Sequence, residues 1–134
     1  MTPEERKLVQ SSFAAVAPIS EQAAELFYGR LFEIAPEVKP LFKGDMKAQG
    51  RKLMQMLSAA VSGLDDLGAL VPVVQDLAKR HTGYGVTAAH YKPVGEAVIW
   101  TLEQGLGDKF TPPVRNAWVK TYGILSNTMI DAAA

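Results

Sequence analysis

The sequence predicts an all-α protein. Signals that start or stop helices recur along the whole chain, and no run of residues alternates with the period of two expected of a strand. The length of 134 residues fits one domain over residues 1–134, because domains most often contain about 100–150 residues. With 48% hydrophobic and 21% charged residues, the composition is that of an ordinary globular protein.

Caps and prolines bound the first two predicted helices. Thr2 and Glu5 form a capping box around a proline at the first helical position, which predicts a helix over residues 3–17. We expect Ser20 to cap a second helix over residues 20–34. That helix should end where it does because a proline follows two residues later.

The middle of the chain contains a corner and two longer helices. Prolines bracket residues 36–42, which indicates a single tight helical turn at a corner. Gly44 provides a break, and Asp45 can cap the helix that follows. Two helices, separated by a turn, are predicted over residues 46–63 and 69–82.

Two more helices complete the prediction. We expect Thr87 to cap a helix that extends to residue 105, and Thr111, which a proline follows, to cap a final helix over residues 112–131. The unequal helix lengths and the proline-bounded corner argue against a regular up-down four-helix bundle.

Charge and composition exclude several classes of function. Fourteen Lys and Arg balance fourteen Asp and Glu, so nothing draws the chain toward nucleic acid or an anionic membrane over long range. The absence of cysteine excludes disulfides, thiolate metal sites and cysteine nucleophiles. No apolar run approaches the ~18 residues of a membrane span, and the polar, acidic start is unlike a signal peptide. We therefore expect a cytoplasmic protein.

The two histidines differ in their surroundings. His81 follows an apolar helical stripe, whereas His90 lies in the first turn of the next helix, where we expect solvent. A lone histidine on an apolar face is more often a satisfied core residue than a metal ligand. Without cysteine or a second inward histidine a closed zinc site is disfavoured, but a haem iron needs only one imidazole from the protein. The stripe before His81 contains Leu70, Val74, Leu77 and Ala78.

Residues that could contact a haem opposite His81 lie on two other predicted helices. Gln49 is the only polar member of an apolar stripe. It could face a haem, or it could reach water from the helix end. Tyr28 lies on an inward face and could instead be a core tyrosine bonded to a carbonyl. Phe42, after the corner, and the methionines at positions 54 and 56 can equally be core filler. The stripe around Gln49 continues through Leu53, Met56, Leu57 and Ala60.

Six short stretches carry a family resemblance. They are LFYGRLF at 26–32, APEVKPLF at 35–42, QGRKLM at 49–54, KRHTGYGV at 79–86, HYKPVG at 90–95 and AWVKTYG at 117–123. In this order and spacing the chain resembles the single-domain bacterial globins and the haem domain of flavohaemoglobins. The resemblance covers essentially the whole chain. It implies a globin fold, with six to eight helices around non-covalently held haem b.

The resemblance also implies roles for individual residues. His81 matches the proximal iron ligand, and Phe42 matches the phenylalanine wedged against the haem. Tyr28 matches the distal tyrosine that hydrogen-bonds bound dioxygen, Gln49 the second distal polar residue, and Leu53 the distal apolar lid.

Further positions would surround the haem. Tyr91 and Val94 match residues that close its walls, and Leu77 joins the contact set from the His81 stripe. Lys52 and Arg80 are candidates to pair with the propionates, although each could equally be a solvated surface charge. The haem would lie between the helices predicted at 46–63 and 69–82.

The function that this implies is reversible binding of dioxygen, with nitric oxide and carbon monoxide as further ligands, for oxygen transport or storage. The alternative is a nitric oxide dioxygenase, which would need a separate reductase because these residues contain no flavin module. A gas sensor ranks behind both, since no output domain is present, and a non-haem helical interaction domain ranks last. In flavohaemoglobins a glutamate near the chain's last helix bonds the proximal histidine. Here Ala133 falls about at that place and Asp131 two residues before it, which disfavours peroxidase-like chemistry.

Overall fold

The computed structural model describes residues 2–42, 44–83 and 88–133, except for the side chains of residues 67, 80–83, 88 and 133. Over these ranges the chain forms helices and no strand, which confirms the all-α prediction. The α-helices are α1 (Pro3–Val16), α2 (Ser20–Ile34), α3 (Met46–Ser62), α4 (Leu67–Gly83), α5 (Tyr91–Leu106) and α6 (Pro112–Ala133). Short 3₁₀ segments join them: η1 (Ala17–Ile19), η2 (Pro36–Leu41), η3 (Gly63–Asp65), η4 (Ala88–His90) and η5 (Gly107–Lys109). None of the described helices is long and apolar enough to cross a membrane.

The capping signals at the starts of α1 and α3 are confirmed. Thr2 N–H donates to the Glu5 carboxylate at 2.9 Å, and Glu5 N–H donates to the Thr2 hydroxyl at 3.1 Å. The Asp45 carboxylate accepts from Lys47 N–H at 3.0 Å. These bonds satisfy donors that the first turn of a helix leaves without an internal partner.

The cap expected from Ser20 is wrong. Ser20 is already in helical conformation, with φ −58° and ψ −36°, and no side chain caps α2. The cause is η1, which carries the chain from α1 into α2 without an extended residue between them. Ser20 N–H then donates to the Ala17 carbonyl. Thr87, the cap expected for the fifth helix, lies outside the described residues.

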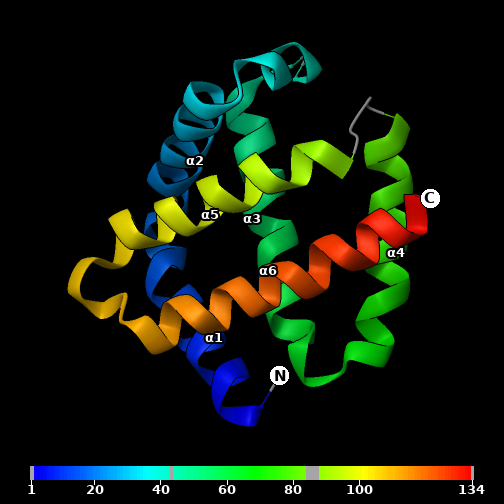
Figure 1. Ribbon diagram of the computed structural model, residues 1–134. Coiled ribbons are helices and arrows are strands. Elements are labelled where there is room, and N and C mark those ends of the chain that lie inside the picture. The colour runs from blue at the N-terminus through cyan, green and yellow to red at the C-terminus, as the bar shows by residue number, and fades with distance from the viewer. Residues whose placement is uncertain (1, 43, 84–87, 134) are drawn as a thin grey trace.

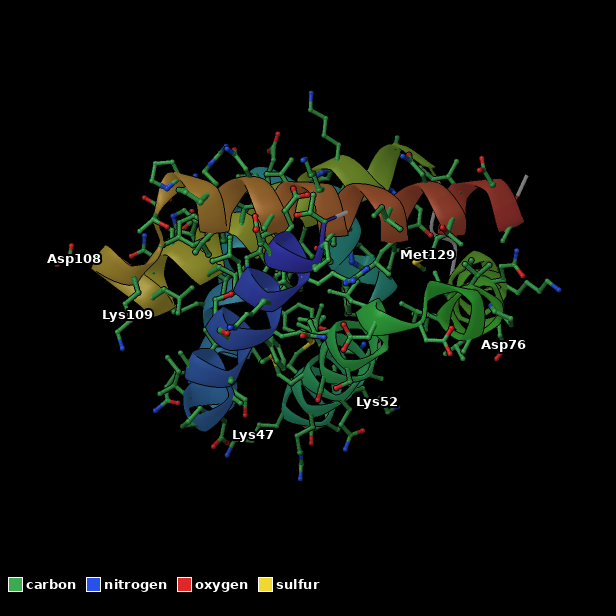
Figure 2. All side chains as sticks on the ribbon, turned by 90° about the horizontal axis from the view of Figure 1, so that it is seen from below. Lys47, Lys52, Asp76, Asp108, Lys109 and Met129 are labelled. Atoms are coloured by element: carbon green, nitrogen blue, oxygen red, sulfur yellow. The ribbon has the colours of Figure 1, made fainter. Side chains whose placement is uncertain are left out.

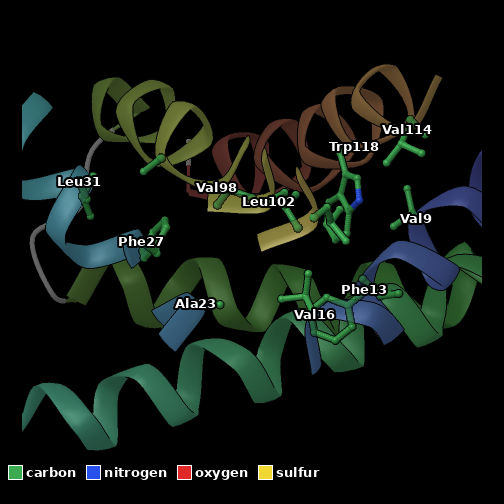
Figure 3. Close-up of a cluster of buried hydrophobic side chains, with 14 of the residues drawn as sticks. Val9, Phe13, Val16, Ala23, Phe27, Leu31, Val98, Leu102, Val114 and Trp118 are labelled. Carbon is green, nitrogen blue, oxygen red and sulfur yellow. The ribbon is translucent and has the colours of Figure 1, made fainter. Parts of the chain in front are cut away.

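Five helices pack around one main core. Figure 1 shows α5 and α6 crossing the front of the molecule, with α2 and α3 behind them and α1 below. The core joins aromatic and aliphatic side chains from α1, α2, α5 and α6, and residues of α3 pack against it. Several of these side chains are visible in Figure 3, where Phe13 and Val16 lie near Trp118. The Trp118 indole N–H, buried there, donates to the Ser12 hydroxyl at 2.8 Å.

The helix α4 packs apart from this core. Its buried residues Leu70, Val74 and Ala78 form a separate small cluster with Met129 of α6, which Figure 2 labels beside α4. In Figure 1, η3 connects α3 to α4 at the lower end of the two helices, and the C-terminal end of α6 lies beside α4. The structure therefore contains two separate apolar clusters, one that α3 packs against and one between α4 and α6.

Candidate functional site

An aromatic group surrounds Tyr28 on α2. Tyr28 is 7% exposed, and its ring centroid lies 4.9 Å from that of Phe27, 5.3 Å from that of Phe42 and 6.0 Å from that of Phe32. The first two contacts are edge-to-face, a favoured geometry for aromatic pairs. Because Phe42 follows η2, the proline-bounded corner folds this ring back against α2. The structure thus brings together Tyr28 and Phe42, two of the residues singled out in the sequence.

Gln49 on α3 completes the polar side of this group. Burial raises the pKa of Tyr28, and a hydrogen bond from the Gln49 side chain partly opposes the rise. Tyr28 therefore keeps its phenolic proton at neutral pH, because the ordinary tyrosine pKa is already about 10. An amide that donates to the hydroxyl oxygen leaves the O–H proton free for another acceptor.

A close helix crossing brings Gln49 to Tyr28. Gly50 is buried against α2, and a Cβ at Gly50 would lie 2.9 Å from the Cβ of Ala24. The two backbones can approach this closely only because both residues are small. Gln49 is adjacent to the crossing point on α3, and Tyr28 lies one turn beyond Ala24 on α2.

The rest of the α3 stripe is apolar and partly exposed. Leu53 and Leu57 pack against the main core without being buried, whereas Ala60 is buried. Lys52 is exposed and lies at the outer edge of α3 in Figure 2. No ion pair of Lys52 occurs among the described side chains, so its expected contact with a propionate stays a prediction.

The α4 stripe has the predicted orientation as far as residue 78. Leu70, Val74 and Ala78 are buried, and Leu77 is partly buried against the same cluster. The backbone of His81 and Arg80 continues α4. Their side chains lie outside the described residues, so iron ligation by His81 and propionate pairing by Arg80 remain predictions. A helix places residues 74, 77, 78 and 81 on one face, because they are spaced by three or four.

The start of α5 contains Tyr91 and Val94, two residues predicted to surround the haem. Tyr91 and Val94 are partly buried, Tyr91 against the α4 cluster and Val94 against the main core. The Tyr122 hydroxyl of α6 donates to the Tyr91 carbonyl. Burial raises the pKa of both tyrosines, so each stays neutral. The first turn of α5 thus contacts both apolar clusters, one through Tyr91 and the other through Val94.

Tyr122 and Gly95 were missed from the sequence. A Cβ at Gly95 would lie 2.5 Å from the Tyr122 ring, so α5 can accept the ring only where it lacks a side chain. The signal was an isolated glycine inside a predicted helix, which often marks a close approach. This contact fixes the position of Tyr91.

His90 is less open to solvent than expected, and Asp131 is exposed. His90 ends η4 and precedes α5 without capping it, and it is half-buried rather than open to solvent. Asp131 is exposed on α6. Among the described side chains, no group of three or more His, Cys, Asp or Glu could hold a metal ion. A single histidine ligand on α4 is compatible with that finding.

The described residues fit a large, flat, apolar group between α3 and α4. Apolar side chains that remain partly exposed come from both sides: Phe42, Leu53 and Leu57 from one, and Leu77 and Tyr91 from the other. A buried hydroxyl donor, Tyr28, lies on the α3 side. A porphyrin iron needs one imidazole from the protein in addition, and the predicted ligand, His81, belongs to α4.

Comparisons with known proteins agree with this arrangement. The Globin family model matches residues 25–129. A flavohemoprotein of Bordetella parapertussis is 32% identical over 134 residues, covering 97% of this chain and 33% of the relative. A flavohemoprotein of Vibrio cholerae is 30% identical, covering 98% of this chain and 34% of the relative. The chain thus spans about a third of the length of these curated relatives.

Solved structures show the same fold. An engineered carbene transferase, described as a putative nitric oxide dioxygenase from Rhodothermus marinus, superposes with a TM-score of 0.88 at 27% identity. That match covers 99% of this chain and 93% of the other. A bacterial globin from Campylobacter jejuni superposes with a TM-score of 0.85 at 23% identity, covering 98% of this chain and 96% of the other.

Proposed function

Because the chain belongs to the globin family, we propose that it holds haem b between α3 and α4 and binds dioxygen reversibly at the ferrous iron. Nitric oxide and carbon monoxide would be further ligands, and residues 1–134 would act as one binding unit. The observation that carries the proposal is the buried Tyr28 side chain, which lies among aromatic rings with the Gln49 amide near its hydroxyl. Haem would supply an iron that binds a diatomic gas.

The chain's residues would divide the remaining work. His81 would ligate the iron from α4, and Leu77, Tyr91 and Val94 would pack against the same side of the porphyrin. Phe42 and Leu53 would pack against the opposite side and exclude water. Lys52 and Arg80 would pair with the propionates, a contact that a charged donor strengthens.

Tyr28 would distinguish dioxygen from carbon monoxide. Dioxygen gains negative charge when it binds ferrous iron, and an O–H donor stabilises that charge. Carbon monoxide gains little charge and so gains less from the donor. A raised pKa keeps Tyr28 in the donating form over the whole neutral range.

A second candidate is nitric oxide dioxygenation, which the similarity to flavohemoproteins favours. The haem would supply the one electron with which dioxygen and nitric oxide combine to nitrate. Each turnover would then consume one electron, which a reductase would have to supply. The same Tyr28 and Gln49 suit both functions, and the electron supply distinguishes them.

Absorption spectra test the proposal. Purified protein, ferric and ferrous, should show a Soret band that shifts when carbon monoxide is added to the ferrous form. Dioxygen should bind and be released by lowering its pressure. A protein that takes up no haem when haem is supplied would refute the proposal. Rapid nitrate formation with sustained turnover in the presence of a reductase would favour the dioxygenase.

A further inference from the structure

A groove opens on the surface between the α1–η1 segment and the outer face of α3. Its volume is about 490 Å³, and sites for small molecules typically measure ~300–1,000 Å³. None of the residues assigned to the haem lines it, so the groove is separate from the proposed haem site. The lining side chains used below are Phe13, Arg51, Met54, Gln55, Ser58 and Ala59.

The apolar part of the groove suits a flat aromatic ring. Phe13 is 8% exposed, and its ring packs against Trp118 with the two centroids 6.3 Å apart, which holds the ring in place. Met54 is partly buried beside it. Aromatic rings stack favourably on one another, and a thioether makes favourable contacts with an aromatic ring. Ala59 lies on the wall and is small enough to leave this space open.

Arg51 gives the groove a positive charge. Within the described part of the chain it is the charged residue among the lining side chains, it is exposed, and it forms no ion pair. The acidic residues closest in sequence to the lining segments are already paired, Glu21 with Lys47 at 3.8 Å and Asp65 with Arg6 at 3.6 Å. A guanidinium group binds a carboxylate through two parallel hydrogen bonds. The groove therefore favours an anion that carries a carboxylate.

Two polar side chains continue from Arg51 along the groove. Gln55 and Ser58 follow it on α3 with spacings of four and three, so all three lie on one face of the helix. Both are exposed, and neither forms a side-chain hydrogen bond with any described residue. An amide and a hydroxyl can each donate and accept, so they can bond a polar substituent of a ligand.

We propose that this groove is a binding site for a small aromatic carboxylate. The carboxylate binds Arg51, the ring lies against Phe13 and Met54, and a polar ring substituent faces Gln55 and Ser58. A rigid ring is favoured over a flexible alkyl chain, because an open groove buries the ligand only in part and a rigid ligand loses less conformational freedom. The site goes beyond the proposed haem function and does not depend on it.

Titration with 2-naphthoate tests the site. In protein with ¹³C-labelled methionine methyl groups, the Met54 signal, identified by its loss in Met54→Leu, should shift and saturate. Carbon monoxide on the ferrous protein keeps the iron occupied, so this shift reports the groove. The uncharged 2-naphthamide should bind about tenfold more weakly, a difference of ~1.4 kcal/mol. A Met54 signal that does not respond to 2-naphthoate would overturn the proposal.

Substitution of Arg51 tests the charged contact. Arg51→Gln should weaken 2-naphthoate about tenfold and leave 2-naphthamide unchanged, because only the carboxylate uses the guanidinium group. Lys7→Gln is the matched control, since Lys7 is exposed on α1 outside the groove and its loss changes the net charge equally. It should leave 2-naphthoate affinity within about twofold. Equal weakening in both variants would show a general effect of charge and overturn the contact.

Added bulk tests the position of the ring. Ala59→Trp should abolish binding by filling the groove, whereas Ala15→Trp, on an exposed part of α1 that does not line it, should leave binding unchanged. Unchanged affinity in the Ala59 variant would overturn the proposed location. Tighter binding of decanoate than of 2-naphthoate would overturn the preference for a ring. A protein that takes up no haem would refute the haem function alone, because the same titration without carbon monoxide still tests the groove.

Discussion

The main core and the α4 cluster differ in how many side chains they bury and in how exposed those side chains are. The core contains side chains such as Val9, Leu31 and Trp118, each 2% exposed or less, and aromatic rings that contact one another. The α4 cluster contains four buried residues, and three of these are 5–8% exposed. The helix also contains Pro72 in its interior, which removes a backbone hydrogen bond. The core therefore buries many more side chains than the α4 cluster, whose described partners come mainly from α6.

The difference indicates where a cofactor would matter most for stability. A flat apolar group between α3 and α4 would add contacts on the poorly packed side and few to the core. Folding and binding would then be coupled mainly through α4, because a ligand stabilises whatever state binds it. Four substitution experiments break or sharpen this comparison.

The largest effect should come from His81→Ala. We expect this variant to lose haem, or to hold it only when imidazole is supplied, because a haem iron needs one imidazole from the protein and the proposal assigns that role to His81. His90→Ala is the control and should leave the absorption spectrum unchanged. Loss of the Soret band in the His90 variant, but not in the His81 variant, would show that His90 rather than His81 is the iron ligand.

The next effect separates the two clusters directly. Leu31→Ala, in the core and 1% exposed, should lower the free energy of unfolding toward the upper end of the ~2–5 kcal/mol typical of such changes. Leu70→Ala, in the α4 cluster and 7% exposed, should fall toward the lower end of the same range. Urea denaturation without added haem measures both. Equal losses would contradict the contrast drawn between core and cluster.

Tyr28→Phe should change gas release while leaving the core packed. A hydrogen bond to a charged acceptor is worth about 1.5–3 kcal/mol, so dioxygen release should become about 10- to 150-fold faster. Carbon monoxide release should change far less. Stopped-flow dissociation measures both rates.

Gln49→Leu is the comparison for that experiment. We expect a smaller increase in dioxygen release than for Tyr28→Phe, because Gln49 lies in the first turn of α3 and can turn toward water. A strong increase in the Gln49 variant, together with little change in the Tyr28 variant, would make Gln49 the main donor.

The smallest effect should come from an ion pair at the surface of the core. Lys120 donates to Glu5 at 2.6 Å, and this bond, with the Thr2 backbone bond, lowers the pKa of Glu5 to about 2. A lowered pKa stabilises the folded state above the ordinary value of 4.5, and the gain is lost as pH falls toward 2. Glu5→Gln should therefore lower Tm slightly at pH 6 and make no difference near pH 2. An equal change at both pH values would show that the charge is not the cause.

Local signals predicted the helices well, because caps and prolines act on the residues next to them. The start of α3 at Asp45 and the 3₁₀ corner after Pro36 are examples. Ser20 failed as a cap because its role depends on the preceding turn, η1, which the composition of the residues does not specify. The residue type alone was an insufficient guide there.

The site was predictable only in part. The inward stripe of α4 through Ala78 and the burial of Tyr28 follow from helical spacing. The bond between Tyr28 and Gln49 could not be predicted from spacing, because it depends on the crossing of α2 and α3 at Ala24 and Gly50. Tyr122 was missed for the same reason, since its partner lies 31 positions away.

The contact between Tyr122 and Gly95 means that the residue types tolerated at positions 95 and 122 depend on each other. No side chain can be added at position 95 while a ring occupies position 122, because a Cβ would come within 2.5 Å of it. A substitution of Gly95 is therefore tolerated only after a smaller residue has replaced Tyr122. Mutational paths through these two positions should therefore be ordered, with one single variant viable and the other not.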